Sequence, residues 1–280
     1  MADEEALVSY DSSRKRRTKV TYRVNIEFFR FFGMTATIAL LLIGKFVTEH
    51  FVKWIRYPDI PFSPEATYIY QLFHFNHTCT VLDFNPSKTI SAIVVMLAII
   101  PLDIFVVLNY FRLEDDFKDG RITRGLLIFN RVITPIQLVC FTFFYMVFVN
   151  TPMDRTSFTL HYIPFMLWQT GLILSAIQQV HYLCQRDHVP FNIPKVWLKM
   201  YEWTVVLVGI YYTYFVWSFL LGHPALDTTH DSQLAITKAI MYIFLIISEI
   251  IPAIFAYVES KNPEVAIGII EFTTLCSVGS

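Results

Sequence analysis

Charge is scarce in this sequence. Asp, Glu, Lys and Arg together make up 16% of its 280 residues, whereas an ordinary soluble domain carries about 25%. Acidic and basic residues nearly cancel, at 23 against 22, so the chain lacks the basic excess of a nucleic-acid-binding domain. Glycine is also rare, with 9 residues, which excludes collagen-like repeats. The composition therefore predicts neither a nucleic-acid partner nor a fibrous protein.

Cysteine is sparse, and metal-binding motifs are missing. The cysteines number four and are too widely spaced for a disulfide framework, at Cys79, Cys140, Cys184 and Cys276. The sequence contains no CxxC or HExxH pair, the spacings that hold a metal ion in many proteins. We therefore expect no metal site and no cofactor.

Hydrophobic residues are abundant instead. They make up 55% of the chain, and Phe alone accounts for 26 residues. Apolar runs of about 20 residues are long enough to cross a bilayer as helices. Six such runs are present, at residues 28–47, 90–110, 126–149, 158–183, 197–221 and 234–258. The sequence predicts an all-α membrane protein, a bundle of six transmembrane helices whose first span is retained as an anchor.

The basic residues predict the orientation of this bundle. Lys and Arg concentrate in cytosolic loops of membrane proteins. Sixteen of the 22 basic residues fall in the two terminal segments and in the second and fourth loops, or just inside the adjoining spans. We expect both termini to be cytosolic. The expected organisation is a basic cytosolic segment at 1–27, a membrane domain at 28–258 with a long lumenal loop at 48–89, and a cytosolic tail at 259–280.

A few polar residues lie inside the predicted spans, where a charge needs a partner, water or a function. Asp103 and Glu249 are expected at similar depth in the cytosolic half, with Arg131 and Gln178 near the same level. One interpretation is an interhelical network that holds the bundle together. The other is a lipid-headgroup pocket or a proton site.

The predicted lumenal side offers histidines, carboxylates and one thiol, residue types that serve in acid–base and nucleophilic catalysis. No spacing among them defines a catalytic pair: His50, His74, His77, Cys79, Asp83, Asp154, His161, His223, Asp227, His230 and Asp231. Asn76 begins an Asn-His-Thr sequon for glycosylation. Ser87, directly after Pro86, is expected to cap the second span, and the free amides there would suit a phosphate.

Residues 72–93, LFHFNHTCTVLDFNPSKTISAI, carry a resemblance to a known family. The segment is similar to the family of the FGF-receptor-activating protein and the damage-regulated autophagy modulators, and most to its Golgi branch that acts after GPI attachment. The matching positions are Cys79, Pro86, Ser87, Ser91, Ala92 and Ile93. The sixth span, with Glu249, also resembles the last span of this family.

The resemblance implies GPI-anchor lipid remodelling, at the fatty-acid reacylation step, in the lumenal leaflet of Golgi or endoplasmic reticulum membranes; plasma membrane and lysosome are the other locations considered. The expected partners are membrane lipid, a GPI-anchored protein or an acyl donor. Candidate catalytic residues are His77, Cys79 and Asp83; candidate lipid-binding residues are Pro86, Ser87, Ser91, Asp103 and Glu249. The alternatives are a non-enzymatic membrane subunit or regulator and, third, a small channel or transporter.

Overall fold

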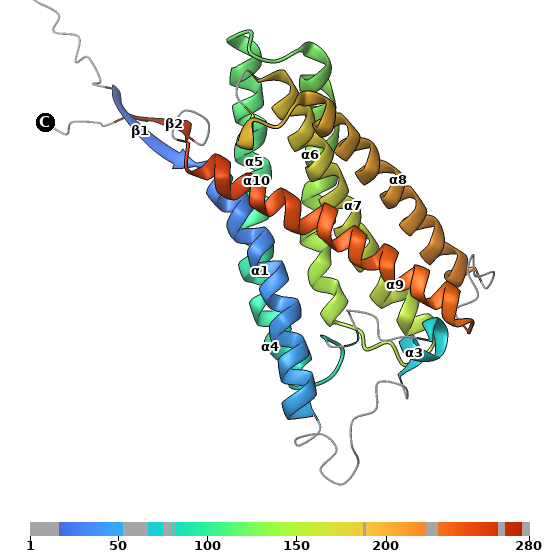
Figure 1. Ribbon diagram of the computed structural model, residues 1–280. Coiled ribbons are helices and arrows are strands. Elements are labelled where there is room, and N and C mark those ends of the chain that lie inside the picture. The colour runs from blue at the N-terminus through green and yellow to red at the C-terminus, as the bar shows by residue number, and fades with distance from the viewer. Residues whose placement is uncertain are drawn as a thin grey trace, which may run out of the picture.

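The protein is an elongated bundle of long helices that run up and down past one another (Figure 1). The computed structural model describes residues 17–52, 67–74, 80, 82–186, 189–221, 229–262 and 267–275. The long helices are α1 (Ile26–Val47), α5 (Met96–Lys118) with the short α4 (Ser87–Val94) before it, α6 (Arg124–Phe143), α7 (Arg155–Gln185), α8 (Lys195–Leu220), and α9 (Asp231–Leu245) followed by α10 (Ile251–Ser260).

Five helical segments are long and apolar enough to cross a membrane. They are Ile26–Phe51, Ser87–Lys118, Arg124–Phe148, Arg155–Gln185 and Asp231–Ser260. The prediction of an all-α, multi-pass membrane protein is confirmed for this part of the chain. The fifth predicted span, at 197–221, coincides with α8, a helix of 26 residues that packs between α7 and α9.

Shorter turns complete the bundle. The π-helical turn η1 (Thr48–Val52) ends the first helix, and the 3-10 turns η4 (Phe144–Phe148) and η5 (Pro190–Asn192) follow α6 and α7. A second π-helical turn, η6 (Ile246–Ile250), joins α9 to α10. The one-and-a-half-turn helix α3 (Tyr68–Phe73) lies in the long first loop and buries Phe73 against aromatic side chains of α7 and α8.

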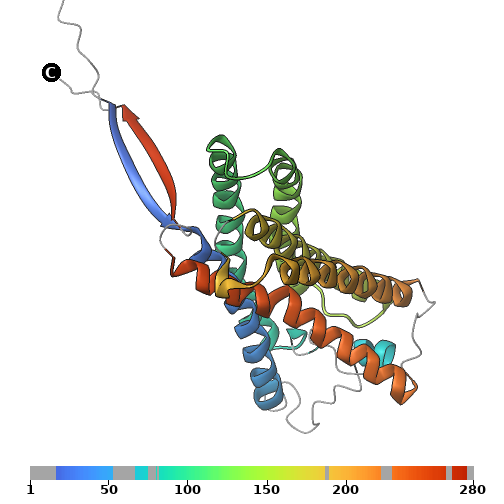
Figure 2. The same ribbon diagram turned by 45° about the horizontal axis from the view of Figure 1, so that its top comes forward.

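A two-stranded ribbon lies outside the bundle, an element that the sequence did not lead us to expect. Strand β1 (Arg17–Asn25) pairs antiparallel with β2 (Ile267–Leu275), with Asn25 opposite Ile267 and Arg17 opposite Leu275. The ribbon projects from the end of the bundle where α1 begins and α10 ends (Figure 2). The two terminal segments therefore lie at the same end of the molecule, which we call the ribbon end.

Close helix contacts depend on small residues. An added Cβ at Gly33 of α1 would lie 2.6 Å from Leu102 Cγ and 3.0 Å from the Ala98 carbonyl oxygen of α5. An added Cβ at Gly171 of α7 would lie 2.7 Å from the Phe141 ring of α6. Membrane helices associate through such close packing, because lipid provides no hydrophobic drive between them. These glycines let the helices that carry the polar residues approach closely.

Candidate functional site

Residues 82–91 form the end of the bundle opposite the ribbon. Leu82 and Phe84 are buried and anchor the turn, and the Asn85–Pro86 peptide bond is cis. Helix α4 begins at Ser87, but its Oγ donates to the Gly44 carbonyl of α1 at 3.1 Å instead of capping its own helix. The prediction of a Ser87 cap is wrong, because Ser87 turns toward the neighbouring helix. The Ser87 hydroxyl thus holds the start of α4 against α1.

Asp83 of this turn lies against a histidine of α7. Asp83 Oδ1 is 3.4 Å from His161 Nε2, and the side chains are 2% and 1% exposed. His161 Nδ1 lies 2.9 Å from the Val147 carbonyl and 3.1 Å from the Asn150 carbonyl. Because carbonyls only accept, Nδ1 carries the hydrogen, and Nε2, which has no hydrogen-bond partner among the described residues, is left as an acceptor that faces Asp83. The fold thus creates an acid–base pair that no sequence spacing indicated.

The surroundings of Asp83 favour its protonated form. Burial raises the pKa of Asp83 well above its ordinary value, and the positive charge of Lys88 opposes this shift in part. The Lys88 ammonium donates to Thr151 Oγ1 at 2.9 Å, and this hydroxyl donates in turn to the Asp83 carbonyl oxygen at 3.4 Å. A polar chain therefore ties the 82–91 turn to the connection between α6 and α7.

Asp154 has a structural role at the same end. Its carboxylate accepts from the Ser157 amide at 2.8 Å and caps α7, while Ser157 Oγ accepts from the Asp154 amide at 3.0 Å. The hydrogen bonds from Ser157 lower the pKa of Asp154. This capping box fixes the start of the helix that carries His161.

The other predicted site residues are dispersed. Ser91 is fully buried beside Gly44, where an added Cβ would lie 3.6 Å from its Oγ. Pro86 is half-buried in the turn. Asp103 accepts a hydrogen bond from Thr142 of α6 at 3.1 Å, on the outer side of the bundle. His77, Cys79 and the sequon at Asn76 lie outside the described residues.

The predicted cluster of Asp103, Arg131, Gln178 and Glu249 is wrong. Arg131 pairs with Glu114 on the surface at 2.6 Å, and Gln178 donates to Asn130. Glu249 interacts instead with Trp168 in the middle of the bundle. Rotation about each helix axis directs these side chains to different neighbours.

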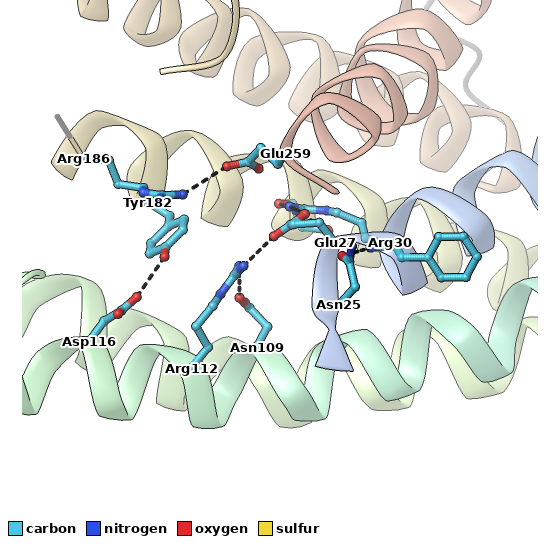
Figure 3. A network of polar contacts seen from close by, with 11 residues as sticks. Asn25, Glu27, Arg30, Asn109, Arg112, Asp116, Tyr182, Arg186 and Glu259 are labelled. Atoms are coloured by element: carbon cyan, nitrogen blue, oxygen red, sulfur yellow. Dashed lines mark hydrogen bonds and ion pairs between the residues drawn. The ribbon is translucent and has the colours of Figure 1, made fainter. Parts of the chain in front are cut away.

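A buried polar network is present at the ribbon end instead (Figure 3). Glu27, with 0% of its side chain exposed, pairs with Arg112 of α5 at 2.7 Å and with Arg30 at 3.6 Å. Arg30 also donates to the Ser175 carbonyl of α7 at 2.7 Å, and Arg112 donates to Asn109. Three helices are joined by one buried carboxylate and two guanidinium groups.

The network continues to the last helix. Glu259 of α10 pairs with Arg186 at 3.3 Å, and the Tyr182 hydroxyl donates to Asp116 at 2.8 Å. The Arg112 guanidinium lies over the Tyr182 ring, 4.6 Å from its centroid. At the ribbon, Asn25 donates to the Ser260 carbonyl at 2.8 Å and joins the start of α1 to the end of α10. Acidic and basic groups compensate each other, as buried charges require.

We missed this network in the sequence, because Arg30, Arg112 and Arg186 were counted as orientation signals. The available signal was Glu27, an acid three residues before Arg30 at a span end, together with Glu259 at the end of the last span. The described residues contain no group of three or more His, Cys, Asp and Glu side chains that would hold a metal ion. Comparisons with family models, curated proteins and solved structures found no match for the chain.

Proposed function

We propose that the chain is a six-span membrane protein with cytosolic termini that acts in GPI-anchor lipid remodelling at the lumenal leaflet. The position of α8 supports a sixth span, and the pairing of β1 with β2 supports an even number of crossings. The basic residues near the ribbon end favour the cytosol for that end. The 82–91 turn then belongs to the lumenal side, where GPI lipids reside.

The observation that carries the chemical part is the Asp83–His161 pair, formed by the segment that carries the family resemblance. In reacylation a lipid hydroxyl attacks the carbonyl carbon of an acyl donor; a new ester C–O bond forms, and the bond between that carbon and the donor's leaving group breaks. The hydroxyl proton passes to His161 Nε2 as general base, and a proton returns to the donor's leaving group. Asp83 Oδ1, 3.4 Å from Nε2, would hold the imidazole in position for this transfer. Because the pair is buried, the lipid hydroxyl reaches Nε2 only when the 82–91 turn moves aside.

The test is a lipid analysis of GPI-anchored proteins from cells that lack this chain. We expect lyso or unremodelled anchor lipid to accumulate, and wild-type protein to restore the remodelled form. Asp83→Asn and His161→Gln should restore it poorly at equal protein abundance. The exposed Lys118→Gln, whose side chain is 69% exposed, should restore it fully. Normal anchor lipid in the deletion cells would refute the proposal.

The second candidate is a non-enzymatic membrane subunit or regulator. Its support is the four exposed aromatic side chains on α8, at Trp197, Trp203, Tyr214 and Trp217, since aromatic residues are enriched at contacts with partner proteins. This function predicts unchanged anchor lipid in deletion cells. It also predicts a membrane protein that crosslinks to α8 through a photoreactive group at position 203.

A further inference from the structure

Glu249 is held inside the bundle by a local change of helix type. In η6 the Ile251 amide donates to the Ile246 carbonyl, five residues back instead of four. The Ile247 carbonyl accepts from the Tyr201 hydroxyl of α8 at 2.5 Å. Pro252 follows and has no amide hydrogen to continue the regular pattern. Such π-helical turns occur frequently at functional sites, and this one leaves the Glu249 side chain 5% exposed.

Glu249 lines a small internal cavity. The cavity has a volume of about 30 Å³, enough for about two water molecules. Its wall is mainly aromatic and aliphatic and comes from α1, η4, α7, α8 and α9. Gln169 of α7 also lines it and is 7% exposed. The cavity therefore combines a mainly apolar wall with two buried polar side chains.

Both polar side chains present an unpaired oxygen. Trp168 interacts with the Glu249 carboxyl, and Glu249 Oε2 has no hydrogen-bond partner among the described residues. Gln169 Oε1 is also without one. Thr37 and Tyr212, the hydroxyls of the wall, interact with the Gly33 carbonyl and with the Tyr162 hydroxyl. Two buried acceptor oxygens in one cavity therefore require hydrogen-bond donors other than the side chains of its wall.

Among the described residues that line the cavity, none carries a positive charge that would compensate a carboxylate. Every element that lines the cavity contributes neutral side chains apart from Glu249, and Tyr212 of α8 is the other titratable group among them. An isolated ionised carboxylate in such surroundings is costly and would need a cation. A hydrogen ion on the carboxyl removes the charge, and the resulting O–H supplies one of the missing donors.

We propose that this cavity is a site for a proton and water, with Glu249 as the neutral acid that donates through water to Gln169 Oε1. The hydrogen ion comes from solvent and adds to the carboxylate without any other bond change. One water then accepts from the Glu249 O–H and donates to Gln169, which satisfies both acceptors. The site lies apart from the Asp83–His161 pair and does not depend on the proposed lipid chemistry.

Infrared difference spectroscopy on the full chain in lipid nanodiscs at neutral pH tests the protonation. Subtracting Glu249→Gln from wild type should reveal one protonated carboxyl C=O band that shifts in D₂O. Glu114→Gln, which alters a surface ion pair on α5, should not remove this band. Gln169→Leu retains Glu249 and should move the band to higher frequency. A carboxylate band in the wild-type minus Glu249→Gln spectrum would overturn the proposal.

X-ray radiolytic footprinting tests the water, since internal water produces hydroxyl radicals beside it. Met241 lines the cavity, whereas the fully buried Met34 of α1 does not. We expect Met241 to be oxidised several-fold faster than Met34 in wild type. Gln169→Leu, which removes one partner of the water, should reduce that difference. Equal rates for both methionines would contradict a hydrated site.

Discussion

At the scale of single residues, the most consequential side chains are charged groups that the fold removes from solvent. Glu27 is buried between Arg30 and Arg112, and Asp83 is buried beside His161. A buried ion pair adds little net stability over an apolar pair of the same shape, but breaking one by removing a single partner is costly. These groups are therefore sensitive to single substitutions.

Arg112→Met should strongly destabilise the protein, because it leaves the Glu27 carboxylate without its closest partner at 2.7 Å. Removing one member of a buried ion pair costs about 3–5 kcal/mol. Thermal unfolding of the variant and the wild type in detergent measures this loss. The double variant Glu27→Gln/Arg112→Met should recover part of this loss. Lys118→Met, which removes an exposed pair with Asp115, should change the melting temperature little. Equal losses for Arg112 and Lys118 would contradict a buried network.

Asp83 should make stability depend on pH. Its pKa in the folded state is raised above the ordinary 3.8, so the folded chain binds more protons than the unfolded chain between the two values. Stability contributed by this group is therefore greatest at low pH and falls as pH rises from about 4 toward the raised pKa. Asp83→Asn should flatten that part of the curve of melting temperature against pH. Parallel curves for wild type and variant would refute the assignment.

At the scale of elements, the contact of α1 with α5 depends on the missing side chain of Gly33. Gly33→Ala should destabilise the protein by about 1–3 kcal/mol, the cost of overpacking a core, because the backbone oxygen of Ala98 at 3.0 Å cannot withdraw as Leu102 can. Gly125→Ala is the matched control, since its Cβ would meet only Thr123 at 4.0 Å. Comparing thermal unfolding of the two variants measures the difference; equal effects would contradict the close approach.

At the scale of the whole molecule, the ribbon joins the two terminal segments. Thr18 and Thr274 are opposite each other in the register. Cysteines at both positions, in a chain with Cys276 replaced by Ser, should form an intramolecular disulfide under mild oxidation. The out-of-register pair of Thr18 with Ile269 should crosslink far less. After cleavage of a central loop, the disulfide keeps the two fragments together on a gel run without reductant. Equal crosslinking of both cysteine pairs would contradict this register.

The hydropathy of the sequence determined by itself where the long helices lie. Runs of about 20 apolar residues must satisfy their backbone groups internally, so they predict helices wherever they occur. All six predicted spans coincide with helices, including α8, because this property is local in sequence. Asp83, Ser87 and Ser91 of the 82–91 turn were also candidate site residues in the sequence, and their functional role stays a prediction.

Only the tertiary structure decided which polar groups meet. Asp83 and His161 are separated by 78 positions yet lie 3.4 Å apart, and Glu27 meets Arg112 across 85 positions. Depth in the membrane follows from distance along a helix, which the sequence provides. Partner choice follows from the rotation and tilt of each helix, which packing at residues such as Gly33 and Gly171 determines. The cluster predicted from depth alone therefore failed, and the networks at the two ends became evident only in three dimensions.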